Sequence, residues 1–330
     1  MSESLNPIEL AVFVARCAAV CDEMGLILRS AAFSPNIKDR LDYSCALFDA
    51  DGRMFAQAAH VPVHLGSMAF AMQQVVGLRQ WQAGDELIWN DPFLGGTHLP
   101  DVTLVRPFFS GSRLLGFVAN RAHHAQIGAA TPGSMPLSKH LDEEGLVIPP
   151  TLLFEGGEVN TALRASLQTA LGAGTAADLA AQSSANRVGI DRLEQMITAL
   201  SAERLVHAIE QLNGYGRAVA EAGVRRIPDG RYSFTDVMDS DGHAAANCAI
   251  KVAITVVDAA VQVDFTGTSA AVPGNINCPL SVTAAGVFYV IRCLLPAETP
   301  ACAGAFDVVT LQATPGCLVH AQRPAATAAG

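Results

Sequence analysis

The sequence predicts a mixed α+β protein in which β-sheets flank an alanine-rich helical segment in the middle of the chain. Three patterns support this fold class. Apolar residues recur at helical spacing near the N-terminus, apolar and polar residues alternate in both halves, and a run of Ala, Leu and Ile punctuated by Gly fills the centre. Half of the 330 residues are apolar and 16% are charged, which allows a large core.

These patterns divide the chain into three regions. We expect an α/β region that carries the candidate metal site at 1–160, a helical segment at 161–225 and an antiparallel, β-rich region at 226–330. After Arg323 and Pro324 the sequence contains only Ala, Thr and Gly, without a capping element or a strand. We therefore expect the last region, and with it the fold, to be truncated at the C-terminus.

Local patterns predict the elements of the first region in order. Asn6 and Pro7 precede an apolar stripe and predict a capped helix that ends near Arg29. A hairpin is expected at 43–55, because the Asp-Ala-Asp-Gly sequence at 49–52 suits its turn. The other elements expected here are a helix at 67–80, strands at 86–89, 102–109 and 114–122, and a long ordered loop at 126–150.

The spacing of apolar residues along the sequence changes twice after residue 160. Helical spacing predicts three helices, at 176–189, 191–200 and 202–223. Alternation then predicts the strands of an antiparallel sheet, and an apolar run predicts a buried helix after them. The strands are expected at 232–238, 249–257 and 261–265, and the helix at 281–295.

Charge and hydropathy exclude several classes of partner. Thirty-one acidic residues against twenty-one basic ones give a formal charge of −10, and no Lys/Arg run matches a phosphate backbone, so nucleic acid is not expected. The N-terminus lacks a secretory pattern, and no apolar run approaches the roughly 20 residues of a membrane helix. We expect a cytoplasmic protein that contacts no membrane. The eight cysteines form no Cys-x-x-Cys pair, and most of them are expected to be reduced core thiols.

A His-x-x-Asp pair followed by two adjacent histidines is the most informative chemical pattern. His98 and Asp101 precede one predicted strand, and His123 and His124 follow the next. Two imidazoles and a carboxylate suit Mn²⁺, Zn²⁺ or Fe²⁺ and leave positions for water or substrate. Because neighbouring residues of a strand face opposite ways, we expect His98, Asp101 and His123 as ligands and His124 outside the ligand set. Alternatively, His98 caps a turn, Asp101 accepts loop N–H groups and the histidine pair is polar surface.

Two nearby patterns allow a structural and a functional interpretation. Gly95 and Gly96 form a tight turn, or they let the backbone approach an anionic substrate. The segment His-Val-Pro-Val-His at 60–64 has the spacing of helical zinc ligands, but Pro62 breaks such a helix and the usual Glu is missing. In an extended segment His60 and His64 would share a face, where they line a pocket or form structural hydrogen bonds.

Several catalytic motifs are missing from the sequence. It contains neither the Gly-x-x-x-x-Gly-Lys-Ser/Thr loop nor the Gly-x-Gly-x-x-Gly loop that bind nucleotide phosphates, so a nucleotide site of either type is not expected in this chain. A Gly-x-Ser-x-Gly elbow is also missing, and no cysteine has the flanking residues of a known nucleophile family. A covalent mechanism through Ser or Cys is therefore not expected.

The segment NDPFLGGTHLPD at 90–101 resembles the signature of the hydantoinase B/oxoprolinase family. Further segments resemble the family in the same order, and together they span nearly the whole chain. They are DYSC at 42–45, the segment 60–66, the histidines at 123–124, PGSMP at 132–136, EGLVIPP at 144–150, ANRVG at 185–189 and DFTGT at 264–268.

The resemblance implies a B-type subunit of an ATP-dependent cyclic amidohydrolase of the 5-oxoprolinase or N-methylhydantoinase type. An A-type partner subunit would phosphorylate the small cyclic amide with ATP. The divalent metal, manganese ahead of zinc or iron, would be held by His98, Asp101 and His123. The other site residues expected are His124, His64 and Asp91 in catalysis, and Gly95, Gly96, Thr97 and His60 in substrate binding.

Two alternatives stay open at this point. One is a subunit of a related ATP-dependent ketone carboxylase, and the other is a non-catalytic scaffold. The scaffold is suggested by the expected truncation and by Gln126, which stands where relatives usually carry an acidic residue. Gln126 keeps a hydrogen-bonding group but removes the charge.

Overall fold

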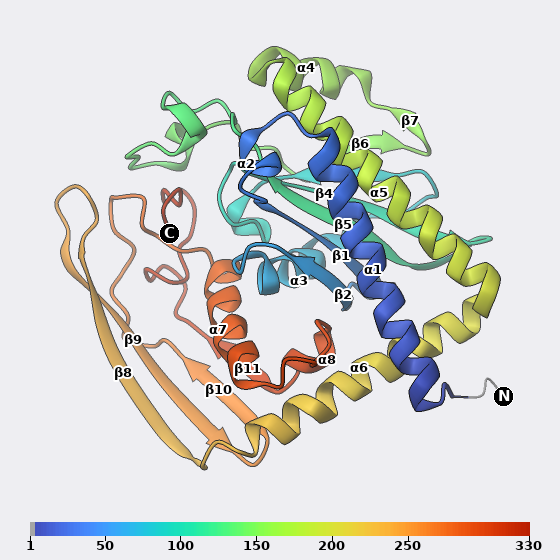
Figure 1. Cartoon of the computed structure of the whole chain (residues 1–330). Coiled ribbons are helices and arrows are strands. Elements are labelled where there is room, and N and C mark those ends of the chain that lie inside the picture. The colour runs from blue at the N-terminus through green and yellow to red at the C-terminus, as the bar shows by residue number, and fades with distance from the viewer. Residues whose placement is uncertain (1–3) are drawn as a thin grey trace.

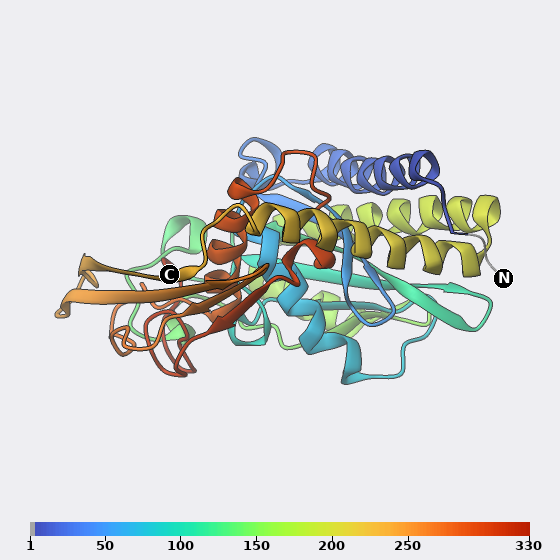
Figure 2. The same cartoon turned by 90° about the horizontal axis from the view of Figure 1, so that it is seen from below.

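The computed structural model describes residues 4–330 and confirms the mixed α+β fold. Within this range, eight α-helices accompany a seven-stranded antiparallel sheet and a four-stranded mixed sheet. Figure 1 shows the long helices α1 and α5 side by side across the larger sheet, with the smaller sheet at the other end of α6. In Figure 2 the α1 and α5 layer lies on one face of the larger sheet and α3 lies on the other.

The larger sheet has the strand order β2-β1-β5-β4-β3-β6-β7. The expected hairpin and the three strands after it are confirmed, whereas β6 and β7 lie in a segment where no strand was expected. The strands are β1 (Tyr43–Asp49), β2 (Met54–Ala59), β3 (Glu86–Trp89), β4 (Asp101–Ser110), β5 (Arg113–His123), β6 (Thr151–Glu155) and β7 (Glu158–Val159). Most residues of β4 and β5 are buried, as expected for central strands covered on both faces.

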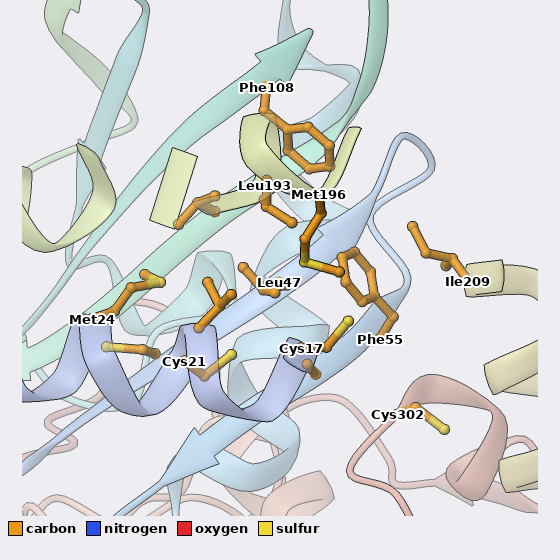
Figure 3. Packing of buried hydrophobic residues seen from close by; sticks show 14 of the residues in the cluster. Cys17, Cys21, Met24, Leu47, Phe55, Phe108, Leu193, Met196, Ile209 and Cys302 are labelled. Carbon is orange, nitrogen blue, oxygen red and sulfur yellow. The ribbon is translucent and has the colours of Figure 1, made fainter. Parts of the chain in front are cut away.

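Helix α1 (Pro7–Ala31) confirms the helix expected from Asn6 and Pro7. The Asn6 side chain accepts from the backbone N–H groups of Ile8 and Glu9, and the Glu9 side chain accepts from the Asn6 N–H. The buried face of α1 packs on β1, β2 and α5 (Ala173–Leu200), as Figure 3 shows. The core there includes Cys17 and Cys21, and burial raises the pKa of both thiols, which agrees with the expectation of core cysteines.

Residues 173–200 form one continuous helix, so the helix break expected after Gly189 is wrong. Gly189 lies on the buried face, and a Cβ there would come within 2.6 Å of Met24 Sδ and 2.7 Å of a Val118 methyl. Glycine therefore permits α5 to approach α1 and β5 closely. Two helices flank α5. Helix α4 (Thr161–Leu171) lies in the region 161–225 that was expected to be helical, although no separate helix was predicted there, and α6 (Ala202–Val224) confirms a predicted helix.

The segment 60–64 is not extended, which is the conformation that would have placed His60 and His64 on one face. Pro62 lies in a turn, with hydrogen bonds from His64 N to Val61 O and from Leu65 N to Pro62 O. His64 is already the first residue of α3 (His64–Val75), which begins and ends earlier than the helix expected at 67–80. His60 and His64 therefore do not share one wall of a pocket.

The smaller sheet has the order β11-β10-β9-β8 and packs on α7 (Leu280–Leu294). Its strands are β8 (Gly230–Ser240), β9 (Ala246–Val257), β10 (Ala260–Asp264) and β11 (Val309–Gln312). The expected antiparallel pairing is confirmed for β8, β9 and β10, but β11 runs parallel to β10, which makes the sheet mixed. Two short helices complete the fold, α2 (Pro35–Lys38) and α8 (Ala303–Phe306).

Three residues after Arg323 are buried, although their composition suggested an end that nothing ties down. Ala326, Thr327 and Ala328 are at most 3% exposed. The side chains of Asn277 and Glu144 form hydrogen bonds with the backbone of these three residues. Among residues 4–330, no helix combines the length and the apolarity needed to cross a bilayer.

Candidate metal centre

Strand pairing at one end of the larger sheet brings the candidate ligands together. Asp101 is the first residue of β4, His123 is the last residue of β5, and the two are direct partners in the antiparallel register. His98 lies one tight turn before β4, where Asp101 N donates to His98 O at 3.1 Å. His98 and His123, 25 positions apart, therefore meet because two neighbouring strands begin and end at the same edge.

The side chains of His98, Asp101 and His123 converge. His98 Nε2 lies 3.2 Å from His123 Nδ1 and 3.5 Å from Asp101 Oδ1, and His123 Nδ1 lies 3.4 Å from Asp101 Oδ1. One ligand atom from each residue can be chosen so that all three lie within 4.8 Å of one another. Asp101 and His123 are buried, and His98 is partly exposed.

The hydrogen bonds of these groups fit a bound cation. His98 Nδ1 donates to the Ala328 carbonyl at 3.1 Å, which leaves the Nε2 lone pair directed at the cluster. Asp101 Oδ2 accepts from Thr97 and from His64, whereas the buried Oδ1 has no hydrogen-bond partner among residues 4–330. A buried carboxylate oxygen normally has a partner. A divalent cation next to Oδ1, His98 and His123 would satisfy it, with a donor set typical of Mn²⁺, Zn²⁺ or Fe²⁺.

Asp42 is a site residue that was not singled out individually as a ligand from the sequence. It directly precedes β1, and the pairing of β1 with β5 places its carboxylate 3.5 Å from His123 Nδ1. Asp42 also forms a second group of potential ligands with His64 and Asp101. The only signal in the sequence was the resemblance of the segment 42–45 to the family, which did not say what the aspartate contacts.

Neighbouring charges shift the pKa values of the residues in this cluster. Burial disfavours a proton on His98, but the Asp101 carboxylate and the bond to Ala328 outweigh it and raise the pKa of His98 to about 9. Burial also opposes charge on Asp101, yet the three surrounding imidazoles hold the pKa of its carboxyl well below the usual range. Burial and the charge of Asp101 raise the pKa of Asp42. The cluster thus concentrates negative charge on Asp101, where a cation is favoured.

A pocket of about 500 Å³ opens beside the cluster. Its size suits a small ring or its phosphorylated form. Polar and apolar groups both contribute to its wall. The lining residues are Asn36, Arg40, Asp42, Val61, Val63, His98, Asp101, His123, Gly133 and Met135.

The two other histidines expected to take part in catalysis are fully buried behind the ligands. His64 Nε2 donates to Asp101 Oδ2 at 3.3 Å, and His64 Nδ1 lies 3.0 Å from the Ser44 hydroxyl. His124 faces away from His123, and its Nε2 bonds to Gln182 Oε1 at 2.9 Å. The opposite orientation of the two adjacent histidines agrees with the expected alternation.

Asp91 and His60 have contacts outside the cluster. The Asp91 carboxylate accepts from Phe93 N and pairs with Arg323. The exposed His60 lies against the Tyr43 ring, with ring centroids 4.5 Å apart. Their expected catalytic and substrate-binding roles stay predictions.

Close packing explains why positions 95 and 96 are glycines. Gly95 has φ +80°, its carbonyl accepts from Arg121, and a Cβ there would lie 2.3 Å from Ala71 Cα. A Cβ on Gly96 would lie 2.5 Å from the Asp91 carbonyl. These contacts favour the tight-turn interpretation. Thr97 is positioned by this turn so that its hydroxyl donates to Asp101.

Replacing Gly95 with alanine is expected to destabilise the protein by about 2–4 kcal/mol, because the new Cβ adds a backbone clash to the strain of a positive φ. Gly111→Ala is the matched control: Gly111 has φ +60°, and a Cβ there would meet nothing within 4 Å. The free energy of unfolding, measured by urea denaturation, should fall much further for Gly95→Ala. Equal losses would show that strain alone, without close packing, determines the requirement for glycine.

Gln126 takes part in loop structure. Its Oε1 accepts from the Ser134 hydroxyl at 2.8 Å, and Ser134 in turn accepts from Ile127 N. The Gln126 carbonyl accepts from Thr175. These contacts fold the long loop after β5 onto α5.

Comparison with known proteins gives a consistent result over the whole length of the chain. The family model described as hydantoinase B/oxoprolinase matches residues 6–330. An uncharacterized protein of Methanocaldococcus jannaschii is 32% identical over 334 residues, which cover 99% of this chain and 59% of that protein. 5-Oxoprolinase 1 of Arabidopsis thaliana is 33% identical over 358 residues, which cover 98% of this chain and 28% of that protein.

A solved structure of another protein has a similar fold. The ATP-dependent caprolactamase from Pseudomonas jessenii matches with a TM-score of 0.92 and 28% identity, over 99% of this chain and 57% of that one. The chain thus spans between 28% and 59% of the length of these three relatives.

Proposed function

The chain belongs to the hydantoinase B/oxoprolinase family, and from this premise we propose that it is the B-type component of an ATP-dependent cyclic amidohydrolase. The family includes ATP-dependent enzymes such as 5-oxoprolinase and caprolactamase. We assign the chain a substrate of the same class, a lactam or cyclic imide, and an A-type partner that uses the ATP. The observation that carries this proposal is the convergence of His98, Asp101 and His123 beside a pocket of about 500 Å³.

The proposed reaction has two stages. On the A-type partner, the amide oxygen of the ring takes the γ-phosphoryl group of ATP, and ADP leaves. Water then adds to the activated ring carbon, and the C–N bond breaks as the ring nitrogen takes up a proton, which leaves an acyl phosphate. A second water hydrolyses this acyl phosphate to the carboxylate and free phosphate. Phosphorylation removes the amide resonance that makes the ring unreactive, so the second stage requires only orientation and polarisation of the substrate.

Residues of this chain bind and orient the groups of the second stage. A divalent cation held by His98, Asp101 and His123 would supply Lewis acidity toward a substrate oxygen. Asp42 is placed to complete the ligand set from the pocket side. His64 donates to Asp101 Oδ2 and holds the carboxylate so that Oδ1 faces the imidazoles. His124, through Gln182, fixes the strand end that carries His123.

The test is an assay of the complex purified with its A-type partner. We expect ATP-dependent release of a ring-opened amino acid from 5-oxoproline, a hydantoin or another lactam, and no ATP hydrolysis by this chain alone. Product formation only from a ketone with bicarbonate would instead establish the carboxylase. A non-catalytic scaffold would leave the activity of the complex unchanged when the cluster is mutated.

A further inference from the structure

Glu144 is a fully buried carboxylate outside the ligand cluster, in the motif at 144–150. Its Oε1 accepts from Thr327 N at 2.8 Å, from Ala328 N at 2.9 Å and from the Ser138 hydroxyl at 2.6 Å. Its Oε2 accepts from the Thr327 hydroxyl at 3.3 Å. The carboxylate therefore clamps the backbone of a segment that lies more than 180 residues later in the chain.

The clamped segment reaches the candidate metal centre directly. We call residues 323–328 the strap. The Ala328 N–H donates to Glu144, and the Ala328 carbonyl accepts from His98 Nδ1 at 3.1 Å. A continuous path therefore leads from the Glu144 carboxylate through one residue of the strap to the His98 ring.

Other contacts hold the rest of the strap without touching His98. Arg323 pairs with Asp91 and lies over the Phe93 ring. Leu141 N donates to Pro324 O at 3.1 Å, and the Asn277 side chain donates to Ala326 O at 3.0 Å. These contacts fix the strap on the loop before β4, on the long loop after β5 and on the segment before α7. Among residues 4–330, Glu144 is the only partner of the Ala328 N–H, and Ala328 is the residue whose carbonyl faces His98.

We propose that Glu144 is a positioning residue that, through the strap, directs His98 Nε2 toward the bound cation. The inference rests on the metal centre of the proposed function. The carbonyl bond fixes which ring nitrogen of His98 carries the proton and in which direction Nε2 points, and such supporting bonds are worth about 10–100-fold in metal affinity. A displaced Ala328 would let the ring rotate away from Asp101 and His123.

A pair of substitutions at Glu144 separates position from charge. Glu144→Asp keeps the charge but withdraws the carboxylate by one methylene, so the full chain should bind Mn²⁺ about tenfold more weakly. Glu144→Gln loses the charge but keeps an oxygen at the Oε1 position, and its amide can donate to the Thr327 hydroxyl. Its Mn²⁺ affinity should stay within about threefold of the wild type. Ser138→Ala, a milder variant that removes one bond to Oε1, should shift the affinity in the same direction as Glu144→Asp.

The matched control is Asp85→Ala. Asp85 is also fully buried and accepts two backbone N–H groups, from Gln82 and Gly156. It lies before β3, however, whereas the loop that carries His98 lies after β3. It should lower the melting temperature and leave Mn²⁺ affinity unchanged. Affinity is read from the free-ion electron paramagnetic resonance signal during Mn²⁺ titration, after circular dichroism has shown that each variant is folded.

The outcomes are distinct. Weaker binding by Glu144→Asp with retained binding by Glu144→Gln supports the positioning role. The inference is overturned if Glu144→Gln loses as much affinity as Glu144→Asp, if neither changes, or if Asp85→Ala weakens binding equally. A wild-type chain that does not bind Mn²⁺ would overturn the proposed metal centre itself, which is a separate result.

Discussion

Replacing Asp101 with alanine is expected to lower Mn²⁺ affinity by more than about 100-fold and to abolish ring opening in the assembled complex. Asp101 contributes the central oxygen, which lies 3.5 Å or less from both candidate imidazole ligands. It also accepts from His64 and Thr97, which hold its orientation. Its loss therefore removes a ligand and releases the groups around it.

Two variants calibrate this prediction. Asp101→Asn keeps the shape and loses the charge, so it should also bind Mn²⁺ weakly if the carboxylate is a ligand. Asp142→Ala removes an exposed aspartate that lies 3.3 Å from His140, and it should bind Mn²⁺ like the wild type. Retained affinity and turnover in Asp101→Ala, measured by titration and by product formation, would exclude Asp101 as a ligand.

The second large effect concerns stability. Arg121→Ala is expected to lower the free energy of unfolding by about 3–5 kcal/mol. The guanidinium is fully buried and donates to the Thr103 hydroxyl at 2.8 Å, the Ser67 hydroxyl at 2.8 Å and the Gly95 carbonyl at 3.0 Å. Burial lowers the pKa of Arg121 to about 10. Its truncation leaves a cavity and three buried oxygens that have lost a donor, one of them in the loop before the candidate metal ligands.

The control for this prediction lies on the same strand. Arg113 begins β5 and is exposed, so Arg113→Ala should change the free energy of unfolding by less than about 0.5 kcal/mol. Arg121→Met fills most of the volume without donating, and it should lie between the two. Denaturant unfolding of the three variants measures the difference. Equal stability of Arg121→Ala and Arg113→Ala would contradict a role for the buried guanidinium.

The sequence predicted that His98, Asp101 and His123 form one set, and the structure brings their side chains together. They converge because β4 and β5 are consecutive strands, and their turn places the start of one beside the end of the other. Alternation along β5 also predicted that His123 and His124 face opposite ways. Local patterns were sufficient where the partners came from strands that are consecutive in the sequence.

Partners from distant segments were not predictable in this way. Asp42 reaches His123 because β1 pairs with β5 on the side opposite β4, a choice of strand order that no local pattern specifies. The bond from His98 to Ala328 spans 230 residues and depends on a backbone carbonyl, which no sequence motif reveals. Gly189 was mistaken for a helix end, because a glycine needed for close packing is identical in sequence to one that ends a helix.

The central claim is that His98, Asp101 and His123 hold one divalent cation, and anomalous scattering from crystals grown with Mn²⁺ tests it most directly. We expect a strong peak in contact with His98 Nε2, Asp101 Oδ1 and His123 Nδ1, and its disappearance in His98→Ala. Crystals that contain ordered Mn²⁺ elsewhere but no peak between these three atoms would contradict it.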